Sequence, residues 1–201
     1  LDKNEVPVVL GCGPIGLAVI AVLRHRGVGP IVAADFVASR REAAERLGAD
    51  VVVDPAQASP FSSWYEIAAP AGFDPADPLV VLGLGPQLPD CVVFECVGRP
   101  GVIESILEGA PRNVRAVVLG VCMEPDSIEP LVAITKEAAL RFVAAYQPDE
   151  FAETLTAIAS GELDAAAMVT GKVGLGGVAD AFERLARPEG HTKIVVEPWR
   201  D

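Results

Sequence analysis

The chain has 201 residues, of which 51% are hydrophobic, so it is long and apolar enough to bury a sizeable core. Its 28 acidic and 16 basic residues give a net charge of -12, which argues against a nucleic-acid surface and against adhesion to anionic lipid. No apolar run reaches the roughly 18 residues of a membrane span, and no secretory signal is visible, so we expect a cytoplasmic protein.

The cysteine and histidine pattern gives no support for a metal site. The four cysteines are scattered and form no C-x-x-C pair: they are Cys12, Cys91, Cys96 and Cys122. This distribution predicts buried thiols in a reducing compartment. The two histidines, His25 and His191, do not lie near a cysteine in the sequence, so we expect no metal ligands in this chain.

Residues 6–54 contain the organising motif. An apolar run at residues 8–10 predicts a buried strand, and glycines follow at positions 11, 13 and 16 in the spacing G-x-G-x-x-G. Residues 15–23 predict a mostly buried helix, and residues 31–34 predict a second strand that stops at Asp35. Strand, glycine turn, helix, strand and acid in this order are typical of a dinucleotide-binding unit.

Each residue of that motif has a physical role. Gly11 permits a tight turn, Gly13 lets the backbone approach a pyrophosphate, and Gly16 lets the helix pack against the strand. Pro14 suits the first helical turn, at the helix end where phosphates are expected to bind. Asp35 lies 19 residues beyond Gly16 (35 − 16), near the offset of about 20 expected for a carboxylate that accepts from ribose hydroxyls.

Two other interpretations fit these residues. A tight strand–helix turn without a ligand would need the same glycines, with Asp35 only capping the following helix. Methyltransferases also combine a glycine turn with an acid after the second strand.

The later elements repeat the strand–helix alternation. Residues 38–47 predict a helix and residues 51–53 a strand. Further strands are predicted at 91–95, 115–121 and 139–145, with helices beginning at 101–107 and at 131–136. Six strands with interleaved helices predict an α/β fold, a doubly wound parallel sheet of the Rossmann type, over residues 1–147. Ligands of such sheets bind beyond the carboxyl ends of the strands.

Two regions depart from this pattern. Residues 55–89 contain seven prolines, with one helical turn expected around Trp64–Ile67 and an extra strand or a packed loop at residues 79–84; we assign them no chemistry. After Tyr146, a helix is predicted at 148–160, a strand at 168–173, a helix at 175–186 and a strand at 193–197. We expect residues 148–201 to form a small α+β segment of another lobe.

The chain resembles the C-terminal part of the zinc-containing medium-chain alcohol dehydrogenases. Four blocks carry the resemblance: VVLGCGPIGLAVIAVLRHRG with VAAD behind it, CVVFECVGRPGVIESIL, RAVVLGV, and the tail EFAETLTAIASGEL, MVTGKVGLGGVADAFERL and HTKIVVEP. They cover nearly all of the chain except residues 55–89. Methyltransferases and short-chain reductases lack the tail block, which removes the methyltransferase interpretation.

The resemblance implies several contacts to NAD. Gly13, Pro14 and Ile15 match positions that present backbone and an apolar contact to the pyrophosphate and the nicotinamide half. Asp35 matches the ribose acid that selects NAD over NADP. Arg40 matches a basic position beside the adenosine ribose, although a solvated charge on the first turn of a helix would look the same.

Further cofactor positions follow from the other blocks. Cys96, Val97 and Gly98 match the loop under the bridge from adenine to ribose, and Arg99 matches the next position. Leu119, Gly120 and Val121 match a strand end whose backbone meets the nicotinamide carboxamide. Lys193 matches a basic residue that reaches the pyrophosphate from the other lobe, and it is also compatible with a plain surface charge.

The implied reaction is hydride transfer between an alcohol and the nicotinamide. The family's catalytic zinc ligands and its four-cysteine structural zinc loop precede the glycine turn, in a region that this sequence lacks. We therefore expect a chain that binds NAD and has no catalytic residue or zinc of its own. A start at Leu1 without Met suggests part of a longer polypeptide or a trimmed chain.

The expected partners are a small alcohol or aldehyde substrate of the full-length enzyme and a second copy of the chain, paired through the edge of the sixth strand. Two alternative functions remain. One is a stand-alone nucleotide-binding module without catalysis. The other is a zinc-independent quinone reductase, which would favour NADPH and is disfavoured by Asp35.

Overall fold

The computed structural model describes residues 5–187 and 190–200. Its main feature is a six-stranded parallel sheet in the order β3-β2-β1-β4-β5-β6. The strands are β1 (Val6–Leu10), β2 (Val32–Ala34), β3 (Val51–Val53), β4 (Cys91–Glu95), β5 (Arg115–Val118) and β6 (Ala139–Phe142). The predicted α/β class and doubly wound parallel sheet are confirmed.

The central strands are buried on both faces. All five residues of β1 are buried, and β1 pairs with β2 on one side and with β4 on the other. A strand covered on both faces reads as a continuous apolar run, which is the pattern of residues 6–10 and 91–94. β1 and β4 lie in register from Val6–Cys91 to Leu10–Glu95, so their carboxyl ends meet at the same edge.

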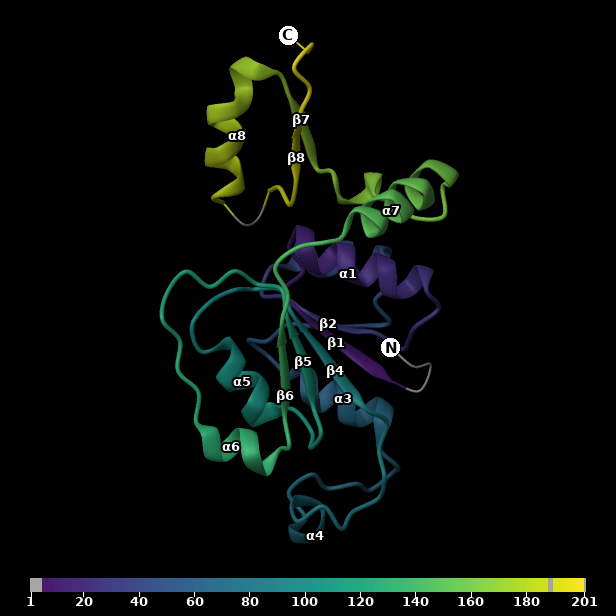
Figure 1. Ribbon diagram of the computed structural model, residues 1–201, viewed down its shortest axis with the longest axis vertical. Helices are drawn as coiled ribbons and strands as arrows, with labels where there is room; N and C mark the ends of the chain where they lie inside the picture. The colour runs from purple at the N-terminus through teal and green to yellow at the C-terminus, as the bar shows by residue number, and fades with distance from the viewer. Residues whose placement is uncertain (1–4, 188–189, 201) are drawn as a thin grey trace.

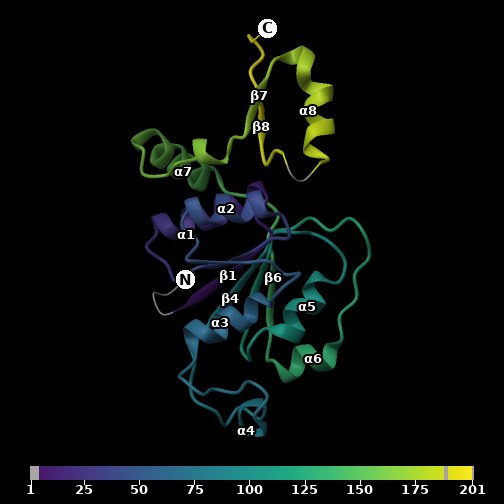
Figure 2. The ribbon, with the colours of Figure 1, turned by 180° about the vertical axis from the view of Figure 1, so that it is seen from behind.

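Helices cover the two faces of the sheet in separate groups (Figures 1 and 2). On one face lie α1 (Pro14–His25) and α2 (Ala38–Arg46), whose Leu17, Ile20 and Ala44 pack into the same cluster as Val9. On the other face lie α3 (Pro60–Ala68) and α5 (Val102–Gly109), with α6 (Pro130–Thr135) beside α5.

The proline-rich region differs from its prediction. Instead of a single turn, α3 is a nine-residue helix, and its buried Trp64 donates from the indole Nε1 to the carbonyl of Val6 at 3.1 Å. The extra strand or packed loop predicted at 79–84 is wrong, because α4 (Pro78–Val81) forms there. Asp77 caps this short helix by accepting from Leu79 N at 2.8 Å, and Pro78 occupies its first position.

The same region borders a cavity of about 380 Å³ at the amino-terminal ends of the strands. Residues that precede β4, β5 and β6 line it, among them Asp90, Arg112 and Glu137. It therefore lies at the edge of the sheet opposite to the glycine turn.

The C-terminal residues form a small lobe stacked over α1 (Figure 1). It contains α7 (Pro148–Ser160), α8 (Val178–Leu185) and a two-stranded parallel sheet of β7 (Gly171–Val173) and β8 (Ile194–Val196). The predicted strand at 168–173 begins only at Gly171, since Ala166–Met168 is a 3₁₀ turn. Another 3₁₀ turn, Leu175–Gly177, replaces the start of the predicted helix, where two glycines disfavour α-helix.

No helix in the described part of the chain is both long and apolar enough to cross a membrane.

Candidate functional site

The glycine turn joins the carboxyl end of β1 to α1, and packing explains two of its three glycines. Gly11 has φ +87, and a methyl group there would lie 2.8 Å from Val97 Cγ2. A methyl group at Gly16 would overlap the carbonyl oxygen of Gly11. At Gly13, however, a methyl group would meet no atom within 4 Å. Space over Gly13 is therefore open, and the packing of the described residues gives no reason for a glycine there.

That open space lies at the N-terminus of α1. Gly13 is the N-cap residue and offers no side chain to the first N–H groups, while Pro14 has no N–H of its own. The first turn contains no acidic residue. Unpaired N–H groups and the positive end of the helix dipole therefore face the open space, which is an arrangement that suits an anion such as a pyrophosphate.

The carboxylate of Asp35 is tied to the same turn. Its Oδ2 accepts from the backbone N–H of Cys12 at 2.8 Å, and its Oδ1 accepts from the N–H of Val37 at 2.8 Å. The side chain is thus more than a cap for the following helix. A carboxylate offers about four acceptor positions, so these two bonds leave acceptor capacity for a ligand.

The two neighbouring arginines have different surroundings. Arg41 donates from Nη1 to the carbonyls of Asp35 and Phe36, both at 2.8 Å, and its Nη2 lies 3.2 Å from Asp54 Oδ2. It fixes the loop after β2. Arg40 Nη1 lies 3.8 Å from Asp35 Oδ2, and its buried Nε has no hydrogen-bond partner among the described residues. Arg40 is therefore the arginine with spare donors beside Asp35.

The loop after β4 lies against the glycine turn on one side and the end of β5 on the other. Cys96 N donates to the carbonyl of Leu10 at 2.9 Å. A methyl group at Gly120 would overlap the N–H of Gly98, so these two backbones are in close contact. Val97 and Val121 are exposed and Leu119 is half-buried. Arg99 is exposed and borders a cavity of about 440 Å³ at the carboxyl ends of β4, β5 and β6.

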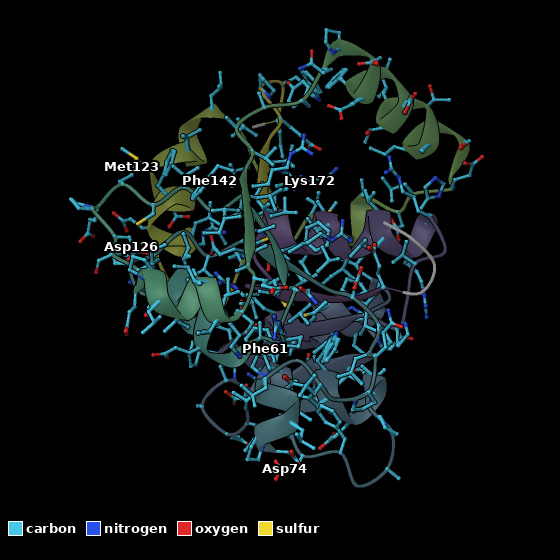
Figure 3. All side chains as sticks on the ribbon, turned by 60° about the horizontal axis from the view of Figure 1, so that its bottom comes forward. Phe61, Asp74, Met123, Asp126, Phe142 and Lys172 are labelled. Carbon is cyan, nitrogen blue, oxygen red and sulfur yellow. The ribbon has the colours of Figure 1, made fainter. Side chains whose placement is uncertain are left out.

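Figure 3 shows two residues from the rim of this cavity, Asp126 on the loop after β5 and Phe142 on β6. The N–H of Gly101, at the start of α5, donates to Asp126 Oδ1 at 2.9 Å. This bond holds the loop after β5 over the start of α5.

Most of the predicted site residues meet at this edge of the sheet, and one does not. Gly11 to Gly16, Asp35, Arg40, the loop at 96–99 and residues 119–121 all follow the carboxyl ends of β1, β2, β4 or β5. Lys193 lies in the C-terminal lobe, where its N–H donates to Thr170 Oγ1. No hydrogen bond or ion pair described for Lys193 joins it to the glycine turn.

The site contains residues that the sequence did not reveal. Phe36, directly after Asp35, exposes 71% of its surface, and the buried Glu95 anchors the loop after β4. For Phe36 the sequence did contain a signal, namely an aromatic residue directly after the acid that ends a strand. For Glu95 the sequence contained no such signal, because a charged residue at the end of an apolar run usually indicates that the strand has reached solvent.

The cysteines of the site are held as thiols. Burial raises the pKa of Cys12 to about 12, and the nearby Asp35 charge adds to the effect. Burial likewise raises the pKa of Cys96 to about 12, assisted by Glu95. A thiolate is the form that acts as a nucleophile or metal ligand, so neither residue is suited to those roles at neutral pH.

Zinc, which the family resemblance implies for complete enzymes, does not fit the described residues. Among residues 5–187 and 190–200, no three His, Cys, Asp or Glu side chains form a group that could hold a metal ion. We therefore derive no chemical step through zinc from this chain.

Comparison with known proteins places this site in a family. The model of a family described as zinc-binding dehydrogenase matches residues 14–160. The (R,R)-butanediol dehydrogenase of Bacillus subtilis is 27% identical over 199 residues, which cover 98% of this chain and 52% of that protein. The sorbitol dehydrogenase of Rattus norvegicus is 28% identical over 196 residues, covering 96% of this chain and 49% of that protein.

Solved structures agree with the sequence comparisons. The crystal structure of 2R,3R-butanediol dehydrogenase from Bacillus subtilis is similar with a TM-score of 0.77 at 27% identity, over 98% of this chain and 52% of that one. The chain thus spans about half the length of the curated relatives that it matches. Because the family match runs from α1 through α7 and covers most of the chain, the chain belongs to the zinc-binding dehydrogenase family.

Proposed function

We propose that this chain is the NAD(H)-binding part of a zinc-dependent alcohol or polyol dehydrogenase. The observation that carries the proposal is the open space over Gly13, at the N-terminus of α1, beside a carboxylate that is hydrogen-bonded to the same turn. The first feature suits a diphosphate and the second suits a ribose. A tight turn without a ligand would explain Gly11 and Gly16, but not the glycine at position 13.

The proposed cofactor follows the carboxyl edge of the sheet. The pyrophosphate lies over Gly13, Pro14 and Ile15, and the adenosine ribose lies at Asp35 beside Arg40. The exposed apolar surfaces of Phe36 and Val97 suit the faces of the adenine ring. The nicotinamide half extends toward the end of β5, at Leu119, Gly120 and Val121. Lys193 is proposed to reach the pyrophosphate from the C-terminal lobe.

We propose NAD rather than NADP as the cofactor. A 2′-phosphate on the adenosine ribose would face the Asp35 carboxylate and would lose the hydrogen bond that a 2′-hydroxyl donates to it. Arg40 reduces this penalty only in part, because its Nη1 already lies 3.8 Å from Asp35 Oδ2.

The bound cofactor would supply the hydride chemistry, and this chain would bind and orient it. The proposed substrate is a small alcohol or aldehyde, acted on by the complete enzyme in the cytoplasm. The zinc that polarises the substrate oxygen would come from residues other than those described. The complete enzyme is proposed to be a homo-oligomer that pairs through the edge of β6.

Titration calorimetry of the chain with NAD and with NADP tests the proposal. We expect NAD to bind, NADP to bind more weakly, and Asp35→Asn to weaken NAD binding by about 1–3 kcal/mol, the scale of a lost charged hydrogen bond. Glu66→Gln, an exposed charge on α3, is the matched control and should bind NAD normally. A folded chain that binds no NAD, or an Asp35→Asn variant with unchanged affinity, would refute the proposal.

A further inference from the structure

Glu95, the last residue of β4, is a buried acidic residue at the edge of the sheet that holds the candidate site. Only 2% of its surface is exposed, and it is one of three buried polar or charged residues in the described chain, with Glu5 and Asp35. Glutamate is almost never fully buried unless it is paired, because burial removes the charge from water. A buried glutamate at the edge of the sheet that holds the candidate site is therefore expected to have hydrogen-bond or ion-pair partners.

Its partners are backbone groups of the two neighbouring loops. The side-chain Oε1 accepts from the N–H of Val97 at 2.6 Å and from the N–H of Gly98 at 2.8 Å. The backbone carbonyl of the same residue accepts from the N–H groups of Leu119 and Gly120, each at 2.9 Å. Glu95 thus bonds to the loop after β4 through its side chain and to the end of β5 through its main chain.

The carboxylate lies where these two loops come into contact. Gly98 has φ +68, a left-handed conformation that helps turn the loop back over the strand end. A methyl group at Gly120 would lie 2.5 Å from Glu95 Oε2 and would overlap Gly98 N, so no space separates the three residues. No ion pair is described for Glu95, so its charge is stabilised by the backbone N–H dipoles of the loop.

We infer that Glu95 is a positioning residue of the dinucleotide site, which holds the loop Cys96–Gly98 in its bound conformation against the end of β5. The inference rests on the proposed function, since both segments belong to the proposed cofactor surface. Without an acceptor, the N–H groups of Val97 and Gly98 would be left unpaired, and the loop would open toward water to satisfy them. Val97 exposes 43% of its surface, so water already reaches the loop from one side.

Two substitutions separate the acceptor from the bulk of the side chain. Glu95→Gln keeps an oxygen that can accept from both N–H groups, whereas Glu95→Met keeps the length of the side chain and removes the acceptor. Titration calorimetry well below the unfolding temperature measures the NAD affinity of both variants. We expect the affinity of the Gln variant to lie within about threefold of that of the original chain. The Met variant should bind roughly tenfold or more weakly, as the loss of about 1.4 kcal/mol would produce.

Amide hydrogen exchange in the cofactor-free chain gives a second readout that does not depend on NAD. The N–H groups of Val97 and Gly98 should exchange slowly in the original chain and in Glu95→Gln, and faster in Glu95→Met. If the Met variant does not fold, Glu95→Asp replaces it: this side chain keeps the charge but is one methylene shorter, so both exchange and NAD affinity should change in the same direction as for Met.

The two readouts also separate this inference from the proposed function. A chain that fails to bind NAD but shows the expected exchange pattern would refute the proposed cofactor and leave the loop contact of Glu95 established. Unchanged exchange at Val97 and Gly98 in a folded Met or Asp variant, or NAD affinity equal to that of the original chain, would overturn the positioning role.

Discussion

Gly13 and Gly16 belong to one motif, yet the structure gives them different tasks. Gly16 is required by packing, because any side chain there would overlap the carbonyl oxygen of Gly11. Gly13 faces open space and has φ -72, a conformation that any residue adopts. The fold therefore needs Gly16, whereas no packing contact among the described residues requires a glycine at position 13.

This difference predicts that substitution by alanine affects stability at Gly16 and NAD binding at Gly13. Gly16→Ala should lower the free energy of unfolding by about 1–3 kcal/mol, the usual cost of overpacking. Gly13→Ala should leave that free energy within about 1 kcal/mol of the original and still remove most NAD binding, because its methyl group would occupy the place of the pyrophosphate. Urea denaturation and calorimetry on both variants measure this. Normal NAD binding by Gly13→Ala would contradict the proposed place of the diphosphate.

At the scale of residues, a fixed spacing in the sequence indicated which residues lie close together in the fold. The spacing of Gly11, Gly13, Gly16 and Asp35 predicted residues that the structure brings together at one turn. The family resemblance indicated Arg40, but the sequence did not show how its surroundings differ from those of Arg41, because adjacent arginines on a helix differ only in where their side chains end. Their separate partners, Asp35 for the first and backbone carbonyls for the second, appear only in three dimensions.

At the level of elements, β6 presents an unpaired edge. The N–H groups of Ala139 and Val143 donate to β5, so those of Leu140 and Phe142 point away from it. β6 is the last strand of the sheet, and in the described chain no strand lies beyond it. Open edges invite pairing with another strand. The edge therefore suits the pairing with a second copy that we expect.

Phe142→Pro tests this pairing. Proline removes an outward-facing N–H and leaves the bonds between β5 and β6 in place. We expect the original chain to form dimers at high concentration in sedimentation equilibrium, Phe142→Pro to be mainly monomeric, and Phe142→Ala, which keeps the N–H, to dimerise more than the proline variant. An original chain that stays monomeric at every concentration, or equal dimerisation of the two variants, would count against the β6 edge as the interface.

Element prediction was reliable where strands and helices alternate regularly along the chain, and weaker outside that alternation. The six strands of the sheet and the helix at 148–160 were confirmed because they belong to a repeated strand–helix pattern or a long periodicity. The fifth and sixth strands are shorter than predicted, since they end at Val118 and Phe142 instead of at residues 121 and 145. The apolar stretch 79–84 looked like a strand, but a capping Asp77 and Pro78 start a helix there instead. Periodicity cannot separate a four-residue helix from a strand, whereas an Asp followed by a Pro is a helix-start signal.

At the level of the whole molecule, the buried thiols make stability depend on pH. In the unfolded chain they ionise near 9.0, whereas in the folded chain the pKa values of Cys12 and Cys96 are about 12. Between these values the folded state binds more protons than the unfolded state, so the free energy of unfolding falls as pH rises. Each thiol contributes a slope of up to about 1.4 kcal/mol per pH unit.

Urea denaturation between pH 8 and pH 10 checks this dependence. Stability should be nearly constant below pH 9 and should decline above it. Replacing both residues, in the variant Cys12→Ala with Cys96→Ala, should make the decline shallower even if overall stability is lower. A decline that is equally steep in the double variant would show that other groups are responsible.

The family match and the length of the chain together shape the functional proposal. The match covers residues 14–160, and the relatives are about twice as long as this chain. The described residues provide a site that fits a dinucleotide and no cluster that fits a metal. The whole reaction is therefore proposed for the complete enzyme, and this chain is proposed to bind and orient its cofactor.

A crystal structure of the chain with bound NADH would show whether the glycine turn and Asp35 hold the cofactor. We expect the diphosphate over Gly13 at the N-terminus of α1, and both hydroxyls of the adenosine ribose within hydrogen-bond distance of the Asp35 carboxylate. NADH bound elsewhere, for example in the cavity at the amino-terminal ends of the strands, or an adenosine ribose that does not contact Asp35, would contradict this expectation.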